Sequence, residues 1–207
     1  QGLHFLLVAP GISGSGHDTF IANQLAQDNS AWSVCSWHVV QQLMQVGGKT
    51  NESGWGVYEA CRQGGGIVAT AHEHSYSRTH LMSEFTTQAV ATTAPKFVIE
   101  PGKTFAVVSG LGGHSIRPQL LSGPWWASVY TSTQGADFGA LFCTFHVNGR
   151  PDVAQCYFKD IQGRIADSFE LRSAVEDLGN HTPLAFAGPD KTVQADNGDG
   201  RMTDTID

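Results

Sequence analysis

The stretch GGGIVATAHEHSYSR, residues 64–78, carries most of the information about the fold. Ile67–Thr70 is a short apolar run preceded by three glycines, which predicts a buried β-strand. His72 and His74 follow this run, and alternate residues of an extended backbone project to the same face. We therefore expect both imidazoles to point at one spot just beyond the end of the strand.

A third histidine follows another predicted strand. His38 comes directly after Trp32–Trp37. Ligands of α/β sheets collect beyond the carboxyl ends of strands, and neutral imidazole is a common metal ligand. The three histidines therefore predict a metal site. The alternative is structural, because a single histidine at a strand end commonly serves packing or hydrogen bonding, and His-x-His pairs also arise by chance.

Other polar residues carry weaker signals. Tyr76 and Arg78 follow the histidine pair and are expected either to orient it or contact an anion, or to have a structural role. His80, His114 and His146 are expected to serve packing or solvent contact.

Turn residues and apolar periodicity divide the chain into elements. The first part alternates strands and helices, and the part after residue 100 is rich in β-structure. The predicted strands are Leu3–Val8, Trp32–Trp37, Ile67–Thr70, Thr104–Ser109, Ala127–Thr133, Gly139–Val147, Val153–Phe158 and Arg164–Leu171, and the predicted helices are Asp18–Asp28 and Gly56–Gln63. The last three strands are expected to form a meander.

Composition excludes some classes of function. The chain has 207 residues and a formal net charge of −7, so a basic surface for nucleic acid is not expected. No apolar run approaches the ~18 residues that span a bilayer, so no membrane segment is predicted. Seven of the 19 acidic residues lie in residues 174–207. We therefore expect one region at 1–173, a linker at 174–182 and a different, acidic segment at 183–207.

The four cysteines include no Cys-x-x-Cys pair, which disfavours a zinc knuckle. Cys143 and Cys156 lie symmetrically about the turn Asn148–Pro151, so they would face each other in a hairpin. Either a cross-strand disulfide or two buried thiols would suit this position.

Three segments together resemble a known family. Asp28–His38, Gly64–Thr70 and Ala71–Thr79 resemble, in order and spacing, the second half of the calcineurin-like metallophosphoesterases, which include the purple acid phosphatases. Val108–Gly113 resembles the glycine-rich segment of the family. Phe138–Leu141 and Ile165–Leu171 resemble its last strands, so the resemblance spans roughly residues 2–172.

The resemblance implies a fold, an activity and a set of ligands. The fold would be the C-terminal half of a four-layer αββα sandwich. His38 and His72 would bind one metal ion and His74 a second, with zinc, iron and manganese all suitable for such donors. Two such ions clamp a phosphoryl group and activate the attacking water. The substrate would be a small-molecule phosphoester.

The sequence also departs from the family. Ala71 stands where the family has glycine, which could shift the imidazole of His72. The motifs Asp-x-His and Gly-Asp-x-x-Asp are absent from these 207 residues, and the string Gly-Asn-His occurs only at 179–181, in the predicted linker and after the histidine pair rather than before it as in the family. Since these motifs supply the bridging aspartate, the asparagine ligand and the acid histidine, the catalytic acid is not found here. We expect a fragment of a larger enzyme that is inactive alone.

The segment 183–207 resembles the start of an Ig-like module of the polycystic-kidney-disease type, which is found in secreted multidomain proteins. Such a sandwich needs about 100 residues, so the module would be truncated. This resemblance implies a secreted, periplasmic or cell-surface protein, with cell-surface or carbohydrate contacts through the module. A calcium loop is disfavoured, because Ala195 and Ile206 would occupy its first and twelfth positions.

Two other functions stay open. The chain could belong to a non-catalytic extracellular binding or adhesion protein that retains the phosphoesterase scaffold. It could also belong to a mononuclear, histidine-rich metal-binding protein.

Overall fold

The computed structural model describes residues 2–174. The predicted Ig-like segment and all but the first residue of the predicted linker lie outside the described residues. The elements, in chain order, are β1 (Leu3–Leu7), α1 (His17–Gln27), β2 (Trp32–Ser36), η1 (Gln42–Met44), α2 (Gly56–Gln63), β3 (Ile67–Thr70), β4 (Tyr76–Thr79), β5 (Leu81–Glu84), β6 (Ala89–Thr92), β7 (Lys96–Ile99), β8 (Ala106–Ser109), β9 (Trp126–Tyr130), η2 (Ser132–Gln134), β10 (Gly139–Phe145), η3 (Val147–Gly149), β11 (Val153–Asp160) and β12 (Ile165–Ser173).

A six-stranded sheet in the order β1-β2-β3-β8-β4-β9 forms the centre of the molecule. Its first four strands run parallel, and β4 is antiparallel to both of its neighbours. The residues of β2, β3 and β8 are mostly buried, because parallel strands are covered on both faces. This near-continuous burial explains why these strands were predictable as short apolar runs.

A second sheet has the order β10-β11-β12-β7. The hairpins β10–β11 and β11–β12 are antiparallel, which confirms the predicted meander, and β7 adds parallel to β12. Cys143 and Cys156 are register partners in the first hairpin and form a disulfide. The cross-strand disulfide is therefore confirmed, and the alternative of two free thiols is excluded.

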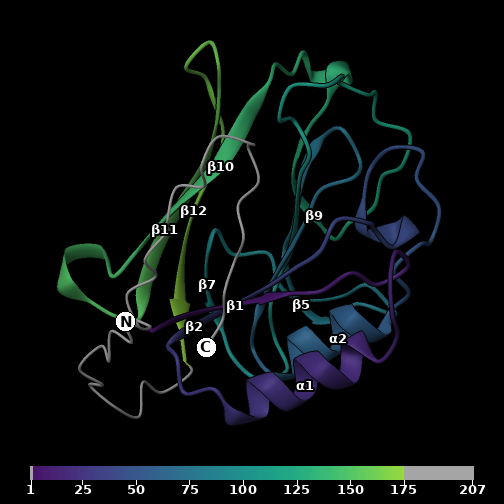
Figure 1. Cartoon of the computed structure of the whole chain (residues 1–207). Helices are drawn as coiled ribbons and strands as arrows, with labels where there is room; N and C mark the ends of the chain where they lie inside the picture. Colours follow the sequence, from purple (N-terminus) through teal and green to yellow (C-terminus); the bar gives the residue numbers. More distant parts are fainter. Residues whose placement is uncertain (1, 175–207) are drawn as a thin grey trace, which may run out of the picture.

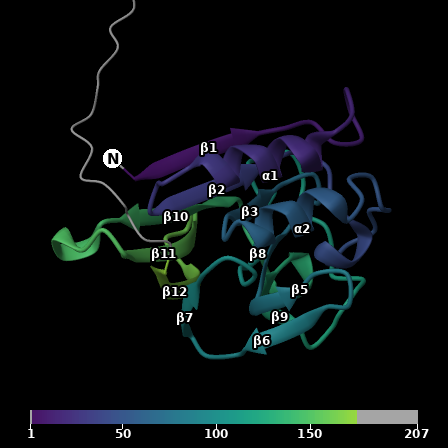
Figure 2. The ribbon, with the colours of Figure 1, turned by 90° about the horizontal axis from the view of Figure 1, so that it is seen from below.

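Two hydrophobic clusters hold the layers together. Side chains of β2 alternate between them: Trp32 and Val34 enter the cluster between the two sheets, whereas Cys35 enters the cluster beneath the helices. Helices α1 and α2 pack side by side on the six-stranded sheet, and β10, β11 and β12 lie on its other side (Figures 1 and 2). The described residues thus form three layers, αββ.

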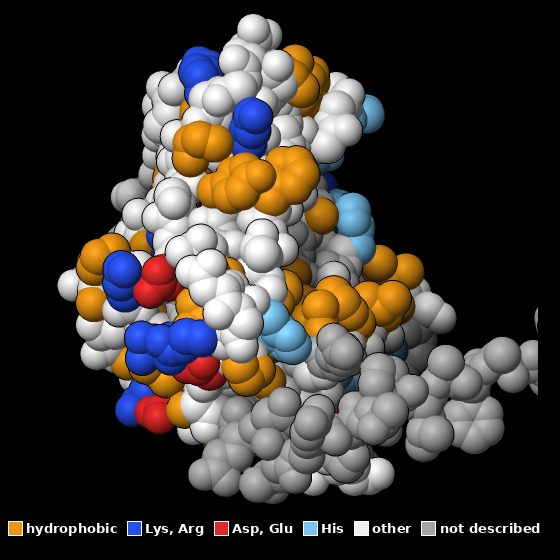
Figure 3. Space-filling model, turned by 90° about the vertical axis from the view of Figure 1, so that its left-hand side faces the viewer, with side chains coloured by type: hydrophobic (Ala, Val, Ile, Leu, Met, Phe, Trp, Pro, Cys, Tyr) orange, Lys and Arg blue, Asp and Glu red, His pale blue; other side chains and the backbone are white. Residues whose placement is uncertain are grey.

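The outer face of the second sheet is covered by no helix of the described residues. Exposed Phe142 and Tyr157 stack there with their ring centroids 5.4 Å apart. Figure 3 shows hydrophobic side chains next to charged ones on this face. The fold is a partial α/β domain that supplies three of the four layers expected for the complete sandwich.

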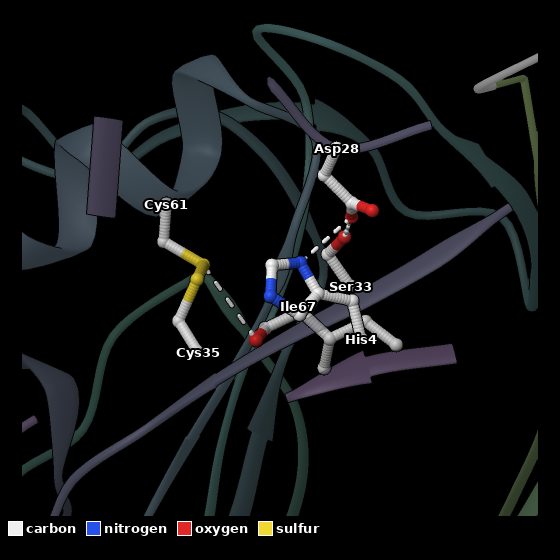
Figure 4. The surroundings of a disulfide bond; sticks show 6 residues. All are labelled: His4, Asp28, Ser33, Cys35, Cys61 and Ile67. Atoms are coloured by element: carbon white, nitrogen blue, oxygen red, sulfur yellow. Dashed lines mark hydrogen bonds and ion pairs between the residues drawn. A yellow bond between two sulfur atoms is a disulfide. The ribbon is translucent and has the colours of Figure 1, made fainter. Parts of the chain in front are cut away.

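A second disulfide joins Cys35 of β2 to Cys61 of α2 and fastens that helix to the sheet (Figure 4). The sequence analysis missed this pair, because 26 residues separate its members and no local pattern relates them. Nearby, Asp28 accepts a hydrogen bond from the Ser33 hydroxyl at 2.6 Å and lies 2.9 Å from Nδ1 of His4. Two disulfides are typical of proteins from oxidising compartments.

The β-rich part begins earlier than predicted, at Tyr76 rather than after residue 100. Strands β4 to β7 were missed: each has only four residues, and Ser, Thr and charged residues make up three of the four in β4 and two of the four in β5. All four residues of β4 are nevertheless buried. Neither α-helix in residues 2–174 has the length and hydropathy needed to cross a membrane.

Candidate functional site

Three neighbouring parallel strands end at the same edge of the central sheet. His38 follows β2, the turn 71–75 follows β3, and the loop 110–117 follows β8. Backbone hydrogen bonds connect these segments: the amide of Ala71 donates to His38 O at 3.4 Å, and the amide of Gly110 donates to Ser75 O at 2.9 Å. The predicted placement of the histidines beyond carboxyl ends of strands is therefore correct.

His38 and His72 face each other at this edge. Nε2 of His38 lies 3.0 Å from Nδ1 of His72, and the ring centroids are 4.8 Å apart. Nε2 of His72 lies 3.1 Å from the Glu52 carboxylate. The order Glu52, His72, His38 is thus a continuous chain of polar contacts.

His74 does not join this pair, which corrects the expectation that His72 and His74 point at one spot. The backbone leaves the extended conformation after Thr70, and His72 has a φ of +50°. Instead, Nδ1 of His74 lies 2.5 Å from the Ser115 hydroxyl, and its ring packs against His114 with the centroids 5.1 Å apart. The alternation rule failed because this segment is a tight turn rather than a strand.

The partner of each ring identifies the nitrogen that is free to bind another group. A carboxylate can only accept, so Glu52 favours a proton on Nε2 of neutral His72 and leaves the Nδ1 lone pair directed toward His38. Carboxylates that orient histidines in this way are common around metal ions. In His74, the contact with Ser115 occupies Nδ1 and leaves Nε2 available.

The pKa values of His72 and His74 are both lowered. Burial is the main cause for His72, and the nearby Lys49 adds to it while Glu52 opposes it. Burial also comes first for His74, followed by the charges of Arg117 and His114. Both rings are therefore held toward the neutral form, which is the form that binds metal.

Glu73 lies between the two histidines and points into the protein. Its side chain is fully buried, and Oε2 lies 3.4 Å from Nη1 of Arg117. Oε1 has no hydrogen-bond partner among the described residues. A side chain at Gly47 would place its Cβ 2.3 Å from the Glu73 carboxyl carbon, so the Glu73 carboxylate would have to shift to admit it.

Tyr76 and Arg78 are directed away from the histidines. The Tyr76 hydroxyl donates to Asp167 at 2.7 Å, and Arg78 donates to the same carboxylate from Nε at 2.7 Å and from Nη2 at 3.0 Å. The Arg78 guanidinium also lies 4.1 Å from the centroid of Phe169. These contacts join the two sheets, so the structure supports the structural interpretation of both residues rather than a contact with substrate.

The other three histidines considered in the sequence analysis are His80, His114 and His146, of which only His114 lies beside the site. His114 is exposed and packs against His74, which agrees with its predicted role in packing or solvent contact and also places it beside the site. For His80, burial and then the charge of Arg78 lower the pKa, and its backbone amide bonds to Trp125 O at 2.8 Å. His146 lies at the end of β10 in a left-handed conformation, away from the strand ends described above.

The sequence analysis missed four residues of this edge: Lys49, Glu52, Ser115 and Arg117. Ser115 and Arg117 follow the glycine-rich segment Val108–Gly113, which was a usable signal. Lys49 and Glu52 lie in an irregular segment, where no periodicity indicates the direction of a side chain.

The donor set fits a metal ion in part. In residues 2–174, no group of three or more His, Cys, Asp or Glu side chains is arranged to hold an ion. The described chain offers two converging imidazoles, His38 and His72, and the separate His74. A four-coordinate or six-coordinate ion would need further ligands.

Comparison with solved structures places the fold. The chain is similar to purple acid phosphatase PPD1 isolated from yellow lupin (Lupinus luteus) seeds, with a TM-score of 0.66, 18% identity, and coverage of 88% of this chain and 34% of the lupin chain. It is also similar to PhoD, with a TM-score of 0.47, 13% identity, and coverage of 80% of this chain and 34% of that chain. The chain thus spans about a third of the length of either structure.

No protein-family model matches this sequence, and the comparison with curated proteins gives no match. At 18% identity, the likeness to the lupin enzyme concerns the fold alone. The described residues therefore have a fold similar to that of part of the lupin purple acid phosphatase chain.

Proposed function

We propose that this chain is part of a protein that hydrolyses small-molecule phosphoesters with the help of two metal ions. His38 and His72 are the proposed ligands of one ion, and Nε2 of His74 is a proposed ligand of the other. The remaining ligands and the catalytic acid are expected from a part of the parent protein outside this sequence. The two disulfides support an extracellular or periplasmic location.

One observation carries this proposal: the facing nitrogens of His38 and His72 on a purple acid phosphatase-like fold. Two nitrogens that bind the same zinc ion, each at about 2.0–2.1 Å, lie roughly 2.9–3.4 Å from each other. The observed separation of 3.0 Å suits such a pair, and Glu52 leaves the lone pair of His72 directed toward the shared position.

The ions would supply the charge that stabilises the phosphoryl group and activates water. The chain's own residues orient the histidines and hold them in place. Glu52 keeps the proton on Nε2 of His72, and Ser115 occupies Nδ1 of His74. The buried strands β2 and β3 hold the histidine-bearing segments next to each other, so the ligand atoms need little reorganisation.

Metal binding by the full 207-residue chain tests the ligand assignment. We expect isothermal titration with Zn²⁺ or Mn²⁺ to detect weak binding that is lost in His38→Ala and in His72→Ala. His17→Ala is the matched control, because His17 is a half-buried histidine on α1 whose Nε2 lies 2.8 Å from Ser13 O. Equal affinity of the His38→Ala variant and the unchanged chain would contradict the assignment.

Hydrolysis of p-nitrophenyl phosphate with added divalent metals tests whether the 207 residues need further ligands from the parent protein for catalysis. We expect no turnover by the 207 residues alone, since three histidines cannot complete a two-metal site. Metal-dependent turnover that is abolished by His74→Ala would show that the chain needs no further ligands. A parent protein that binds metal but cleaves no phosphoester would favour the non-catalytic scaffold.

A further inference from the structure

The loop 110–117 is fastened over the histidine turn by several contacts. The amide of Arg117 donates to His74 O at 3.0 Å, and the amide of Gly110 donates to Ser75 O at 2.9 Å. The carbonyl of Glu73 lies so close to Gly110 that any Cβ there would collide with it. The side chains of this loop therefore have a defined position beside His74.

Arg117 presents its positive charge at this position. Its side chain is 38% exposed, whereas its partner Glu73 is fully buried. A single contact of 3.4 Å between Nη1 and Oε2 joins them, in contrast to the paired contacts of Arg78 with Asp167. One edge of the Arg117 guanidinium is thus tethered, and the planar group retains donors for a second anion.

Two histidines and a lysine complete the surroundings. Exposed His114 packs against His74, and the Ser115 hydroxyl lies within hydrogen-bond distance of both rings, 2.5 Å from Nδ1 of His74 and 3.3 Å from Nδ1 of His114. Lys49 is close enough to lower the pKa of both His72 and His74. Cationic and neutral donors therefore surround His74, and the carboxylate of this group is buried beneath them.

We infer that Arg117 and His114 form the anion-binding side of this site and hold the terminal phosphate of a phosphomonoester against His74. This inference rests on the proposed function and names its substrate class. A terminal phosphate carries up to two negative charges and three oxygens, which suits a guanidinium beside imidazole donors. A diester has one charge and two free oxygens, so it would gain less from Arg117.

Glu73 acts here as a positioning residue. Its buried carboxylate contacts one edge of the guanidinium and so favours the position of Arg117 beside His74. The absence of a side chain at Gly47 leaves the room that this carboxylate needs.

Phosphate binding by the full chain without added metal tests the inference. A ³¹P NMR titration with inorganic phosphate is expected to show binding that Arg117→Gln weakens about tenfold, the loss typical of a charge-assisted hydrogen bond. His114→Ala is expected to weaken it as well, and Arg117→Lys to restore part of the affinity. Arg150→Gln is the control, because Arg150 is an exposed arginine that pairs with Asp152 far from the site.

A titration with dimethyl phosphate, a diester, tests the preference for a monoester. We expect the chain to bind it more weakly than inorganic phosphate, and Arg117→Gln to reduce this difference. Equal affinity for both ligands in the unchanged chain would overturn the preference for a monoester. Melting temperatures of the same samples show whether Arg117 merely fastens the loop, because that role would lower the melting temperature and leave phosphate affinity unchanged.

The two proposals fail separately. Loss of phosphate binding in Arg117→Gln together with no metal binding at His38 would support the anion site and contradict the metal site. Metal binding at His38 with phosphate affinity unchanged in both Arg117→Gln and His114→Ala would overturn the present inference alone.

Discussion

Asp167 on β12 is the residue that most directly joins the two sheets. It accepts hydrogen bonds from Tyr76 and Arg78, which both lie on β4 of the facing sheet. The side chains of Arg78 and Asp167 are each only 7% exposed. Burial and then the charge of Asp167 raise the pKa of the Tyr76 hydroxyl, so this hydroxyl stays a donor at neutral pH.

Replacing Asp167 should therefore lower the free energy of unfolding by more than the loss of a single hydrogen bond would. We expect Asp167→Asn to lower the free energy of unfolding by about 3–5 kcal/mol, because it leaves the buried Arg78 charge without its counterion. Tyr76→Phe removes only one hydrogen bond and should cost about 1 kcal/mol. Urea denaturation measures both, and equal losses would show that the charge of Asp167 contributes little.

At the scale of elements, the two disulfides differ in what they connect. Cys35–Cys61 joins β2 to α2 within the core beneath the helices, and both cysteines are fully buried. Cys143–Cys156 joins two neighbouring strands of one hairpin, and Cys143 is exposed. The first disulfide holds two layers together, whereas the second reinforces a hairpin that backbone hydrogen bonds already connect.

Removing the Cys35–Cys61 disulfide should therefore be the more damaging change. The separations of 26 and 13 residues correspond to about 3.5 and about 2.9 kcal/mol of lost loop-closure entropy. The cavity left by two buried sulfurs adds to the first value. We expect Cys35→Ala with Cys61→Ala to lower the free energy of unfolding more than Cys143→Ala with Cys156→Ala. Urea unfolding of both double variants measures this, and the reverse order would contradict the argument.

Elements with a strong apolar pattern were predictable. Gly56–Gln63 and Ile67–Thr70 have the bounds that the sequence indicates, because local periodicity and the flanking glycines define them. Tyr76–Thr79 was not predicted, although all of its residues are buried. Tyr76 and Arg78 of this strand are tolerated in the interior because Asp167, about 90 residues away in the sequence, pairs with them.

At the scale of the whole molecule, buried and hydrogen-bonded carboxylates determine the response to acid. Burial alone would raise the pKa of Asp160, but hydrogen bonds from the Tyr130 hydroxyl and from the backbone and side chain of Arg164 lower it overall. The pKa of Asp28 is also lowered, since hydrogen bonds from Ser33 and Ser30 outweigh its burial.

These lowered pKa values predict acid sensitivity. The folded state holds both carboxylates ionised at a lower pH than the unfolded chain does, so their contribution is complete above about pH 4 and is lost as pH falls further. We expect the free energy of unfolding to drop steeply below that pH. Asp160→Asn should be less stable at neutral pH and should show a flatter decline in acid. Urea denaturation between pH 7 and pH 3 measures this, and an unchanged slope in the variant would contradict the role of Asp160.

The candidate site shows where inference from sequence ends. Strand order and apolar runs were enough to place His38, His72 and His74 beyond the ends of neighbouring strands, because burial in a parallel sheet leaves a local pattern. The direction of each ring depended on the tight turn at His72 and on partners elsewhere in the chain, Glu52 and Ser115. Local periodicity holds no information on such distant contacts. Only the folded chain therefore shows that His72 faces His38, that His74 faces the loop of Arg117, and that Arg78 pairs with Asp167.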